Sequence, residues 1–345
     1  MTTCYIAIGL RRKRNDICLD VYFPEIKKVE INESLLNSIN KKFVSKSELT
    51  VELETQLTGK YSDQLLNSEI SSDYASSDVG VFCLTSLDDE ISSVEDAFFK
   101  LQLLSQRHVK PHQLNLAQLF GTLNNLAWTN KGPILLDDLD YMRIQTKLAG
   151  AELVVSHVDK FPYLVNYHVP SGVRIAAGSQ VRLGAYLGEG TTVMPAGYIN
   201  FNAGTIGNAM VEGRVSAGVL VDLQTDIGGG ASIMGTLSGG NDHVISVGKK
   251  CLLGANSGIG ISLGDGCTVA AGLYVYAGKK VYLLNKENEP VNLDGNKVES
   301  GENIVKASQL SGRDYLLFIE DSQTGQLFCK PNTKLIELNE SLHVN

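Results

Sequence analysis

The chain has 345 residues, 43% of them hydrophobic, which is enough for two or three domains with substantial cores, and its formal net charge of −8 argues against a nucleic-acid binder. Its six cysteines show no CxxC spacing, so the sequence indicates neither a zinc site nor a disulfide framework, and we expect reduced thiols. No signal peptide and no apolar run of membrane-spanning length is visible, and we expect a soluble cytoplasmic protein.

Residues 1–110 read as an α/β domain. Tyr5–Leu10 and Ile17–Phe23 are predicted strands, joined by a turn over Arg11–Asp16. The basic run Arg11–Arg14 is then a solvated turn, with an anion-binding patch as the alternative.

Further along this domain, Asn32 is a candidate cap for a helix that ends near Lys42. Gly80–Thr85 reads as a buried strand. Ser92 with Glu95 suggests a capping box for a helix that ends near Arg107.

Residues 111–168 read as a helical connector with lead-in strands. Apolar spacing predicts helices over Leu114–Trp128 and Leu135–Leu148, and Trp128 is expected to serve packing. Leu153–Val158 and Tyr163–Val169 are predicted strands.

A period of six residues runs from Val169 to Val281. Aliphatic residues follow this spacing to Ile199, slip by four residues before Val215, pause at Gly239 and resume from Ile245. Glycine recurs three residues later in most hexads. A six-residue period fits neither a helix nor an alternating strand, but it fits a solenoid of short strands with glycine-permitted corners.

Such hexads resemble the left-handed parallel β-helix of hexapeptide-repeat acyltransferases, and the handedness is implied by that resemblance alone. The expected fold is therefore mainly β: an N-terminal α/β domain (1–110), the connector (111–168), a left-handed β-helix (169–282) and a C-terminal loop with a β-hairpin cap (283–345).

The last segment departs from the hexads. Asn285–Asn303 is polar and reads as a surface excursion. Tyr315–Ile319 and Gln326–Lys330 are predicted to form a hairpin that covers the open edge of the last coil.

Two irregular stretches of the repeat are candidate sites, because regular coils mainly serve the fold. The slip at Asn200–Thr205 leads to Met210–Arg214, in which Glu212 is a candidate general base or nucleophile, or half of a surface ion pair with Arg214. The second stretch, Leu237–His243, offers His243 as a rival base or as an exposed turn histidine. A three-histidine metal site is excluded, because His243 is the only histidine within residues 169–281.

Several non-repeat stretches go beyond the hexad pattern. They are Val173–Ile175, Val181–Ala185, Glu189–Met194, Asn202–Thr205, Met210–Arg214, Gly228–Gly240, Gly254–Gly258 and Ala271–Val275. The order and the amino-acid sequences of these stretches closely resemble those of the tetrahydrodipicolinate N-succinyltransferase family, in its longer-chain branch. The resemblance implies transfer of a succinyl group from succinyl-CoA to the amine of ring-opened tetrahydrodipicolinate, in lysine and diaminopimelate biosynthesis. It also implies a homotrimer with active sites between neighbouring solenoids.

Carried over onto matching positions, the resemblance makes Glu212 the catalytic residue, with its role as nucleophile or base left open. The implied succinyl-CoA contacts are Arg214, Gly229, Ser232, Ala255, Ala270, Ala271, Gly278, Lys306 and Ser322. Arg174 and Arg182 are our candidates for the dicarboxylate acceptor, with a solvated solenoid face as the alternative.

No permanently bound cofactor is expected. Some relatives hold magnesium through acidic residues, but the aligned positions here are Ser179 and Ala196, and the nearby Glu189 aligns with neither, so no metal is predicted. Two other functions stay open: a different CoA-dependent N- or O-acyltransferase with His243 as base, and a purely structural solenoid.

Overall fold

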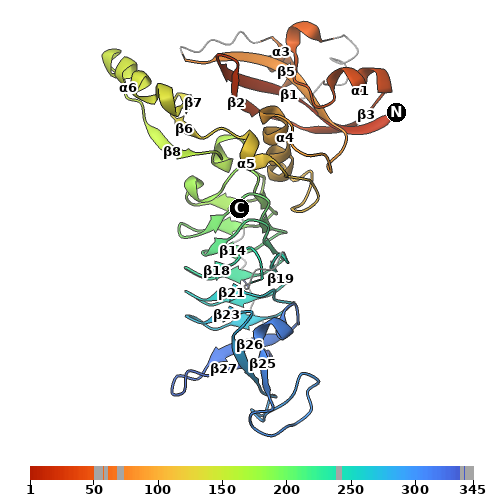
Figure 1. The fold of residues 1–345 in the computed structure, drawn as a ribbon, viewed down its shortest axis with the longest axis vertical. Helices are drawn as coiled ribbons and strands as arrows, with labels where there is room; N and C mark the ends of the chain where they lie inside the picture. Colours follow the sequence, from red (N-terminus) through yellow and green to blue (C-terminus); the bar gives the residue numbers. More distant parts are fainter. Residues whose placement is uncertain (50–56, 58–60, 68–73, 238–242, 335–337, 339–345) are drawn as a thin grey trace. The chain divides into compact units, whose positions relative to one another are not determined.

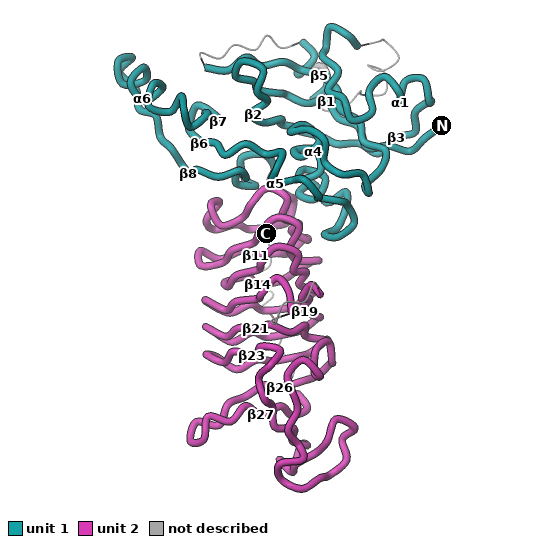
Figure 2. Tube along the Cα trace, viewed as in Figure 1, with its two compact units in different colours: residues 1–168 teal, residues 169–345 magenta. Residues whose placement is uncertain are grey.

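The computed structural model describes residues 1–49, 57, 61–67, 74–237, 243–334 and 338. The chain divides into two compact units, residues 1–168 and residues 169–345 (Figure 2). The four-part division drawn from the sequence stays a prediction.

An antiparallel sheet forms the centre of the first unit. Its long middle strand β1 (Thr2–Arg14) pairs with β2 and β5 along one path, and its first half pairs with β3. The other elements are β2 (Ile17–Tyr22), β3 (Lys27–Ile31), α1 (Glu33–Ile39), β4 (Val44–Ser45), the 3-10 helix η1 (Lys46–Glu48), α3 (Ser62–Leu66), β5 (Ser76–Leu84) and α4 (Val94–Ser105). The three strands predicted here are confirmed, although β1 begins three residues before the predicted Tyr5 and ends four residues after the predicted Leu10.

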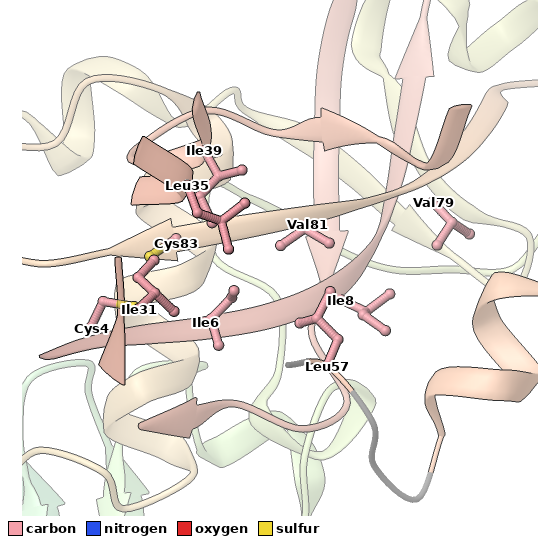
Figure 3. Packing of buried hydrophobic residues seen from close by; sticks show 10 residues of the cluster. All are labelled: Cys4, Ile6, Ile8, Ile31, Leu35, Ile39, Leu57, Val79, Val81 and Cys83. Carbon is pink, nitrogen blue, oxygen red and sulfur yellow. The ribbon is translucent and has the colours of Figure 1, made fainter. Parts of the chain in front are cut away.

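Both faces of this sheet are buried. One face carries a core of aliphatic residues and two cysteines from β1, β3, α1 and β5 (Figure 3). On the other face Phe23, Phe82 and Phe99 of α4 pack ring against ring. The buried Gln102 of α4 donates to the carbonyl of Val21 and accepts from the backbone N–H of Phe23, which ties the helix to the end of β2.

The basic run is not a solvated turn. Arg11 lies within β1 and donates to Asp78 and Glu95, while Arg12 pairs with Asp20. The prediction failed because the acidic partners come from β2, β5 and α4, which the local sequence does not show.

The helix caps are close to their predicted places. Asn32 accepts from the N–H of Leu35 as expected, but α1 ends at Ile39 instead of Lys42. The cap of α4 is one residue later than predicted, because Ser93 accepts from the N–H of Asp96.

The rest of the first unit is an arm with a small sheet in the order β7-β6-β8 (Figure 1). Its elements are α5 (Leu119–Thr122), β6 (Leu126–Thr129), β7 (Gly132–Leu135), η2 (Leu136–Asp138), α6 (Leu139–Leu148), β8 (Val155–Asp159) and η3 (Leu164–Asn166). The predicted second helix, Leu135–Leu148, is confirmed from Leu139 onward, although Leu135 ends β7, and the first lead-in strand is confirmed as β8. The predicted helix Leu114–Trp128 is wrong, and so is the strand Tyr163–Val169, whose start is η3.

Trp128 explains why the first of these helices fails. It lies on β6 and donates its indole N–H to the carbonyl of Asp159 at 2.8 Å, and its ring stacks on His157. Packing against β8, which is distant in sequence, outweighs the local apolar spacing. Its predicted packing role is confirmed.

The second unit is a three-sided solenoid of short parallel strands. Strands stack in register along three sheets, so that Ile175, Val193, Val211, Ile227 and Leu253 succeed one another in one column. The strands and one short helix are β9 (Arg174–Ile175), η4 (Gly178–Gln180), β10 (Tyr186–Leu187), β11 (Thr192–Val193), β12 (Tyr198–Ile199), β13 (Gly204–Thr205), β14 (Met210–Val211), β15 (Arg214–Val215), β16 (Leu220–Val221), β17 (Asp226–Ile227), β18 (Ser232–Ile233), β19 (Ser246–Val247), β20 (Leu252–Leu253), β21 (Gly258–Gly260), β22 (Thr268–Val269) and β23 (Tyr274–Tyr276).

The repeat slips at a different place from the one predicted. Thr205 and Val211 are fully buried in the inward columns, so the six-residue period continues through the stretch taken for the slip. The short step is the one from Val211 to Val215. In the next coil the strands place Val247, Leu253 and Ile259 in these columns, two residues after the predicted Ile245, Cys251 and Ser257, although Ile245 is also buried. A second four-residue step, from Ile259 to Leu263, restores the predicted register, and Leu263, Val269 and Val275 lie in the columns as predicted.

A hairpin covers the last coil, as predicted. β26 (Leu316–Glu320) pairs antiparallel with β27 (Leu327–Pro331) and parallel with β22, and Phe318 of β26 is fully buried beside Val269. β24 (Lys280–Leu283), β25 (Ile304–Lys306) and the 3-10 helix η5 (Ala307–Leu310) complete the cap. In the described part of the chain, no helix is long and apolar enough to span a membrane.

Candidate active site

The corner that carries Glu212 is shorter than its neighbours. Only Glu212 and Gly213 separate β14 from β15, whereas four residues form the corresponding turns before and after it, at 194–197 and 228–231. The N–H of Glu212 donates to Ile227 at 2.8 Å, and its carbonyl accepts from Gly230 at 3.2 Å. Backbone bonds on both sides therefore fix the position of this residue.

Glycine is required at position 213. A methyl group there would lie 2.3 Å from the carbonyl oxygen of Ala231 in the next coil. The missing side chain is what allows a two-residue corner to stack directly on the coil below.

The Glu212 carboxylate lies over Gly229. A Cβ atom placed on Gly229 would be 3.6 Å from Glu212 Oε2 and would meet no other atom within contact distance. Glu212 is half-buried and Arg214 is exposed, and within the described residues neither makes an ion pair. The alternative of a Glu212–Arg214 salt bridge is therefore wrong, and the carboxylate is available to accept a proton.

Below Glu212, the turns of successive coils stack into a column of backbone groups. The carbonyl of Gly229 accepts from Asn256, and that of Ala255 accepts from Gly272, each at 2.8 Å. Within the described chain, the N–H groups of Gly229, Ala255 and Ala271 donate to no acceptor. With coils about 4.8 Å apart, the column extends about 14 Å from Glu212. It is a line of free donors bordered by small residues.

Arg214 and Ser232 form a second row beside this column. They are aligned across adjacent strands, and the row continues to Gly258 and Tyr274. The exposed ring of Tyr274 lies directly over Gly258. Tyr274 was not singled out from the sequence, and the only local signal was an aromatic residue in an outward position next to a glycine of the preceding coil.

The remaining predicted CoA contacts lie in the cap region. The N–H of Ala270 donates to the carbonyl of Phe318 in the hairpin. Gly278 and Lys306 are both exposed, and they lie near each other because Lys280 pairs with Lys306 across β24 and β25. Lys279 lies 3.9 Å from Glu320. Ser322 is exposed in the hairpin turn, outside the column.

The structure does not gather the other candidates at Glu212. Arg174 is exposed on β9, two strands from β14 in the same sheet. Arg182 donates to Asn200 at 3.2 Å, on another corner. His243 is exposed at the base of a loop on that other corner, where its carbonyl accepts from Leu237, and residues 238–242 of this stretch lie outside the described residues.

Ser179 and Ala196 are exposed on the two turns that precede Glu212 on its own corner, and Glu189 lies on a different corner beside Gly172. Within the residues that the structure describes, no group of three or more His, Cys, Asp or Glu side chains could hold a metal ion.

Comparisons with known proteins point to one family. Residues 123–163 match the family model for the middle region of tetrahydrodipicolinate N-succinyltransferase, and residues 244–277 match that for the hexapeptide repeat of succinyl-transferase. The 2,3,4,5-tetrahydropyridine-2,6-dicarboxylate N-succinyltransferase of Vibrio cholerae is 55% identical over 265 residues, which are 77% of this chain and 74% of that protein. The enzyme of the same name from Pseudomonas aeruginosa is 52% identical over 254 residues, 74% of this chain and 71% of its own.

A crystal structure from Campylobacter jejuni, assigned to a 2,3,4,5-tetrahydropyridine-2-carboxylate N-succinyltransferase, superposes with a TM-score of 0.78. It is 34% identical in sequence, and the match covers 96% of this chain and 93% of that one. The identities and coverage are high enough to establish the family, and the chain belongs to the tetrahydropyridine-dicarboxylate N-succinyltransferases, the tetrahydrodipicolinate N-succinyltransferase family.

Proposed function

We propose that the protein transfers a succinyl group from succinyl-CoA to the amine of ring-opened tetrahydrodipicolinate, 2-amino-6-oxopimelate. The products are N-succinyl-2-amino-6-oxopimelate and CoA, in lysine and diaminopimelate biosynthesis. The observation that carries the proposal is the position of Glu212, an unpaired carboxylate at the head of a column of free backbone donors.

In the transfer, the amine nitrogen forms a bond to the succinyl carbonyl carbon and the C–S bond of the thioester breaks. As a base, Glu212 accepts a proton from the amine, and the thiolate leaves as CoA after protonation. As a nucleophile, Glu212 first displaces CoA to form an acyl anhydride, which the amine then opens. Backbone N–H groups at the corner are suited to the oxyanion in either route.

The donor lies along the column. The amide carbonyl oxygens of the pantetheine arm accept hydrogen bonds from the free N–H groups of Gly229, Ala255 and Ala271. The small residues there, including Ala270, let the arm approach the backbone. Arg214 and Ser232 flank the thioester end. Gly278, Lys306 and Ser322 lie toward the phosphates and nucleotide, where the Lys306 ammonium provides charge.

The proposed function also includes an assembly of three subunits and a site for the acceptor. The solenoid is a left-handed β-helix, and three copies form a homotrimer with active sites between neighbouring solenoids. Arg174 and Arg182 bind the acceptor carboxylates. The protein is cytoplasmic and binds no permanent cofactor or metal.

The test is CoA release from succinyl-CoA, followed with a thiol reagent, with and without the acceptor. Glu212→Gln is expected to lower acceptor-dependent release 10²- to 10⁴-fold, the usual contribution of general-base catalysis. The exposed Glu189→Gln, with the same change of charge, and His243→Ala are expected to stay within about threefold of wild type.

A burst of CoA release without acceptor, equal to the number of sites, would assign the nucleophile role to Glu212. Loss of activity in His243→Ala with full activity in Glu212→Gln would overturn the mechanism. Acceptor-dependent release with acetyl-CoA but not succinyl-CoA would overturn the donor.

A further inference from the structure

Tyr274 carries a large exposed ring on the outer face of the solenoid. It is the first residue of β23, and 44% of its surface is exposed although the next residue, Val275, is fully buried. Among the residues that the structure describes, its hydroxyl group has no hydrogen-bond partner and its ring packs on no other ring. The exposed side of the ring is therefore an apolar surface that a ligand can cover.

The backbone below Tyr274 provides the space in which this ring lies. Gly258 is the residue paired with Tyr274 in the preceding coil, and a methyl group there would lie 2.2 Å from the ring atom Cε1. The missing side chain of Gly258 is what lets the ring lie against the sheet. Because coils are about 4.8 Å apart, the ring covers the levels of two successive coils.

Two of the free N–H donors of the column belong to the same two coils. Ala271 precedes Tyr274 by three residues and Ala255 precedes Gly258 by three, which is at most about 10 Å along the chain. Neither N–H group donates to an acceptor within the described chain. A ligand that accepts hydrogen bonds from these donors therefore passes beside the ring.

We propose that Tyr274 is a specificity-determining residue whose ring packs against the dimethyl carbon in the pantoyl part of the donor's pantetheine arm. The inference rests on the proposed function and deepens it, because it names the part of the CoA thioester that this residue recognises.

The spacing of the groups along the arm fits this contact. The nitrogens of its two amides are four bonds apart, roughly 5 Å in an extended chain, close to the rise of about 4.8 Å between coils. The two amides therefore reach successive donors, with the second amide at Ala255 or at Ala271. The dimethyl carbon follows the carbonyl of that second amide by two bonds, roughly 2.5 Å. In either position it lies at a level that the Tyr274 ring covers.

The experiment measures kcat/KM of wild type, Tyr274→Ala, Tyr274→Phe and Tyr276→Ala with three donors. Succinyl-CoA and succinyl-pantetheine both carry the pantoyl group, whereas S-succinyl-N-acetylcysteamine keeps the thioester and the first amide but lacks that group. Tyr276 is the matched control, because it is a tyrosine of the same strand, 46% exposed, that lies about 7 Å farther from the column.

Tyr274→Ala is expected to lose about tenfold with succinyl-CoA and with succinyl-pantetheine, as for two methyl groups that are no longer buried. It should match wild type with S-succinyl-N-acetylcysteamine. Tyr274→Phe keeps the ring and should match wild type with every donor. Tyr276→Ala should match wild type with succinyl-pantetheine.

Three results would overturn the inference. An equal loss with all three donors would assign Tyr274 to the shape of the solenoid face. A loss confined to succinyl-CoA would place the ring against the nucleotide. A loss in Tyr274→Phe as large as that in Tyr274→Ala would assign the contact to the hydroxyl group.

Binding of CoA itself, measured by calorimetry without an acceptor, separates this inference from the proposed function. If Tyr274→Ala bound CoA about tenfold more weakly than wild type, but neither protein transferred a succinyl group, the function would be wrong and the contact would stand. If wild type transferred succinyl groups and Tyr274→Ala kept both its CoA affinity and its kinetics, the contact would be wrong and the function would stand.

Discussion

Gly213 and Gly229 lie one coil apart on the same corner, yet a methyl group is expected to act differently at each. At Gly213 it would lie 2.3 Å from the carbonyl oxygen of Ala231, so Gly213→Ala should cost about 1–3 kcal/mol of stability through displaced backbone. At Gly229 it would meet only Glu212 Oε2, at 3.6 Å, so the fold should tolerate Gly229→Ala.

The proposed donor path passes over Gly229, so Gly229→Ala should lower kcat/KM for succinyl-CoA by about tenfold, a loss of about 1.4 kcal/mol of transition-state binding. Thermal unfolding and steady-state kinetics on both variants separate the two effects. Unchanged kinetics in a well-folded Gly229→Ala would show that the donor does not lie there.

Among single residues, the sequence made Glu212 a candidate but misplaced the irregularity around it. Thr205 is a polar residue in a fully buried inward position. The hexad that it belongs to therefore does not show in the pattern of aliphatic residues, and the slip was predicted too early in the chain. The absence of an ion pair to Arg214 also could not be predicted, because proximity in sequence does not determine where two outward side chains point.

Among the elements, β1 owes part of its length to the charges it carries. Arg11 donates to Asp78 at 2.6 and 3.0 Å and to Glu95 at 2.8 Å, and its guanidinium lies over the ring of Phe43. Arg11→Ala should therefore lower the free energy of unfolding by about 1–3 kcal/mol at pH 7, a range that allows for the partial exposure of Asp78. The exposed Lys131→Ala should change it by less than about 0.5 kcal/mol.

The pH dependence of this loss follows from Asp78. Burial alone would raise the pKa of its carboxyl group, but the hydrogen bond and charge of Arg11 outweigh burial and hold the pKa below its ordinary value. A carboxyl group with a lowered folded-state pKa stabilises the fold above its unfolded pKa, about 3.9, and this stabilisation is lost as pH falls through the folded pKa. Unfolding curves of wild type and Arg11→Ala should therefore converge below about pH 4, and a constant difference would contradict the argument.

Which elements could be predicted depended on where their partners lie in the sequence. The hexad strands and the α6 helix were predictable because their burial follows a local period. The extension of β1 and the strand β6 were not, because they depend on Asp78, Asp20 and β8, which are distant in sequence. The cap hairpin was predictable for two reasons. Its turn residues indicate a hairpin, and the open edge of a solenoid needs a segment that pairs with its backbone groups.

For the whole solenoid, the proposed donor path begins at Glu212 and ends in the cap, and its two ends can be tested separately. Lys306 is exposed on β25 beside Gly278, in register with Lys280. Lys306→Ala should raise KM for succinyl-CoA about fivefold, equivalent to about 1 kcal/mol for a charge-assisted contact that is partly solvated. It should leave kcat unchanged, because Lys306 is remote from the reacting carbonyl.

A shortened donor provides the decisive comparison. Succinyl-pantetheine carries the thioester and the arm but none of the CoA phosphates, so wild type and Lys306→Ala should use it equally well. Lys286→Ala, which removes an exposed lysine from the polar excursion of the same unit, should match wild type with both donors. If Lys306→Ala impaired both donors to the same degree, the lysine would act on the fold of the cap and the phosphates would lie elsewhere. A loss confined to succinyl-CoA would fix the direction of the donor along the coils, with its thioester at Glu212 and its nucleotide at the cap.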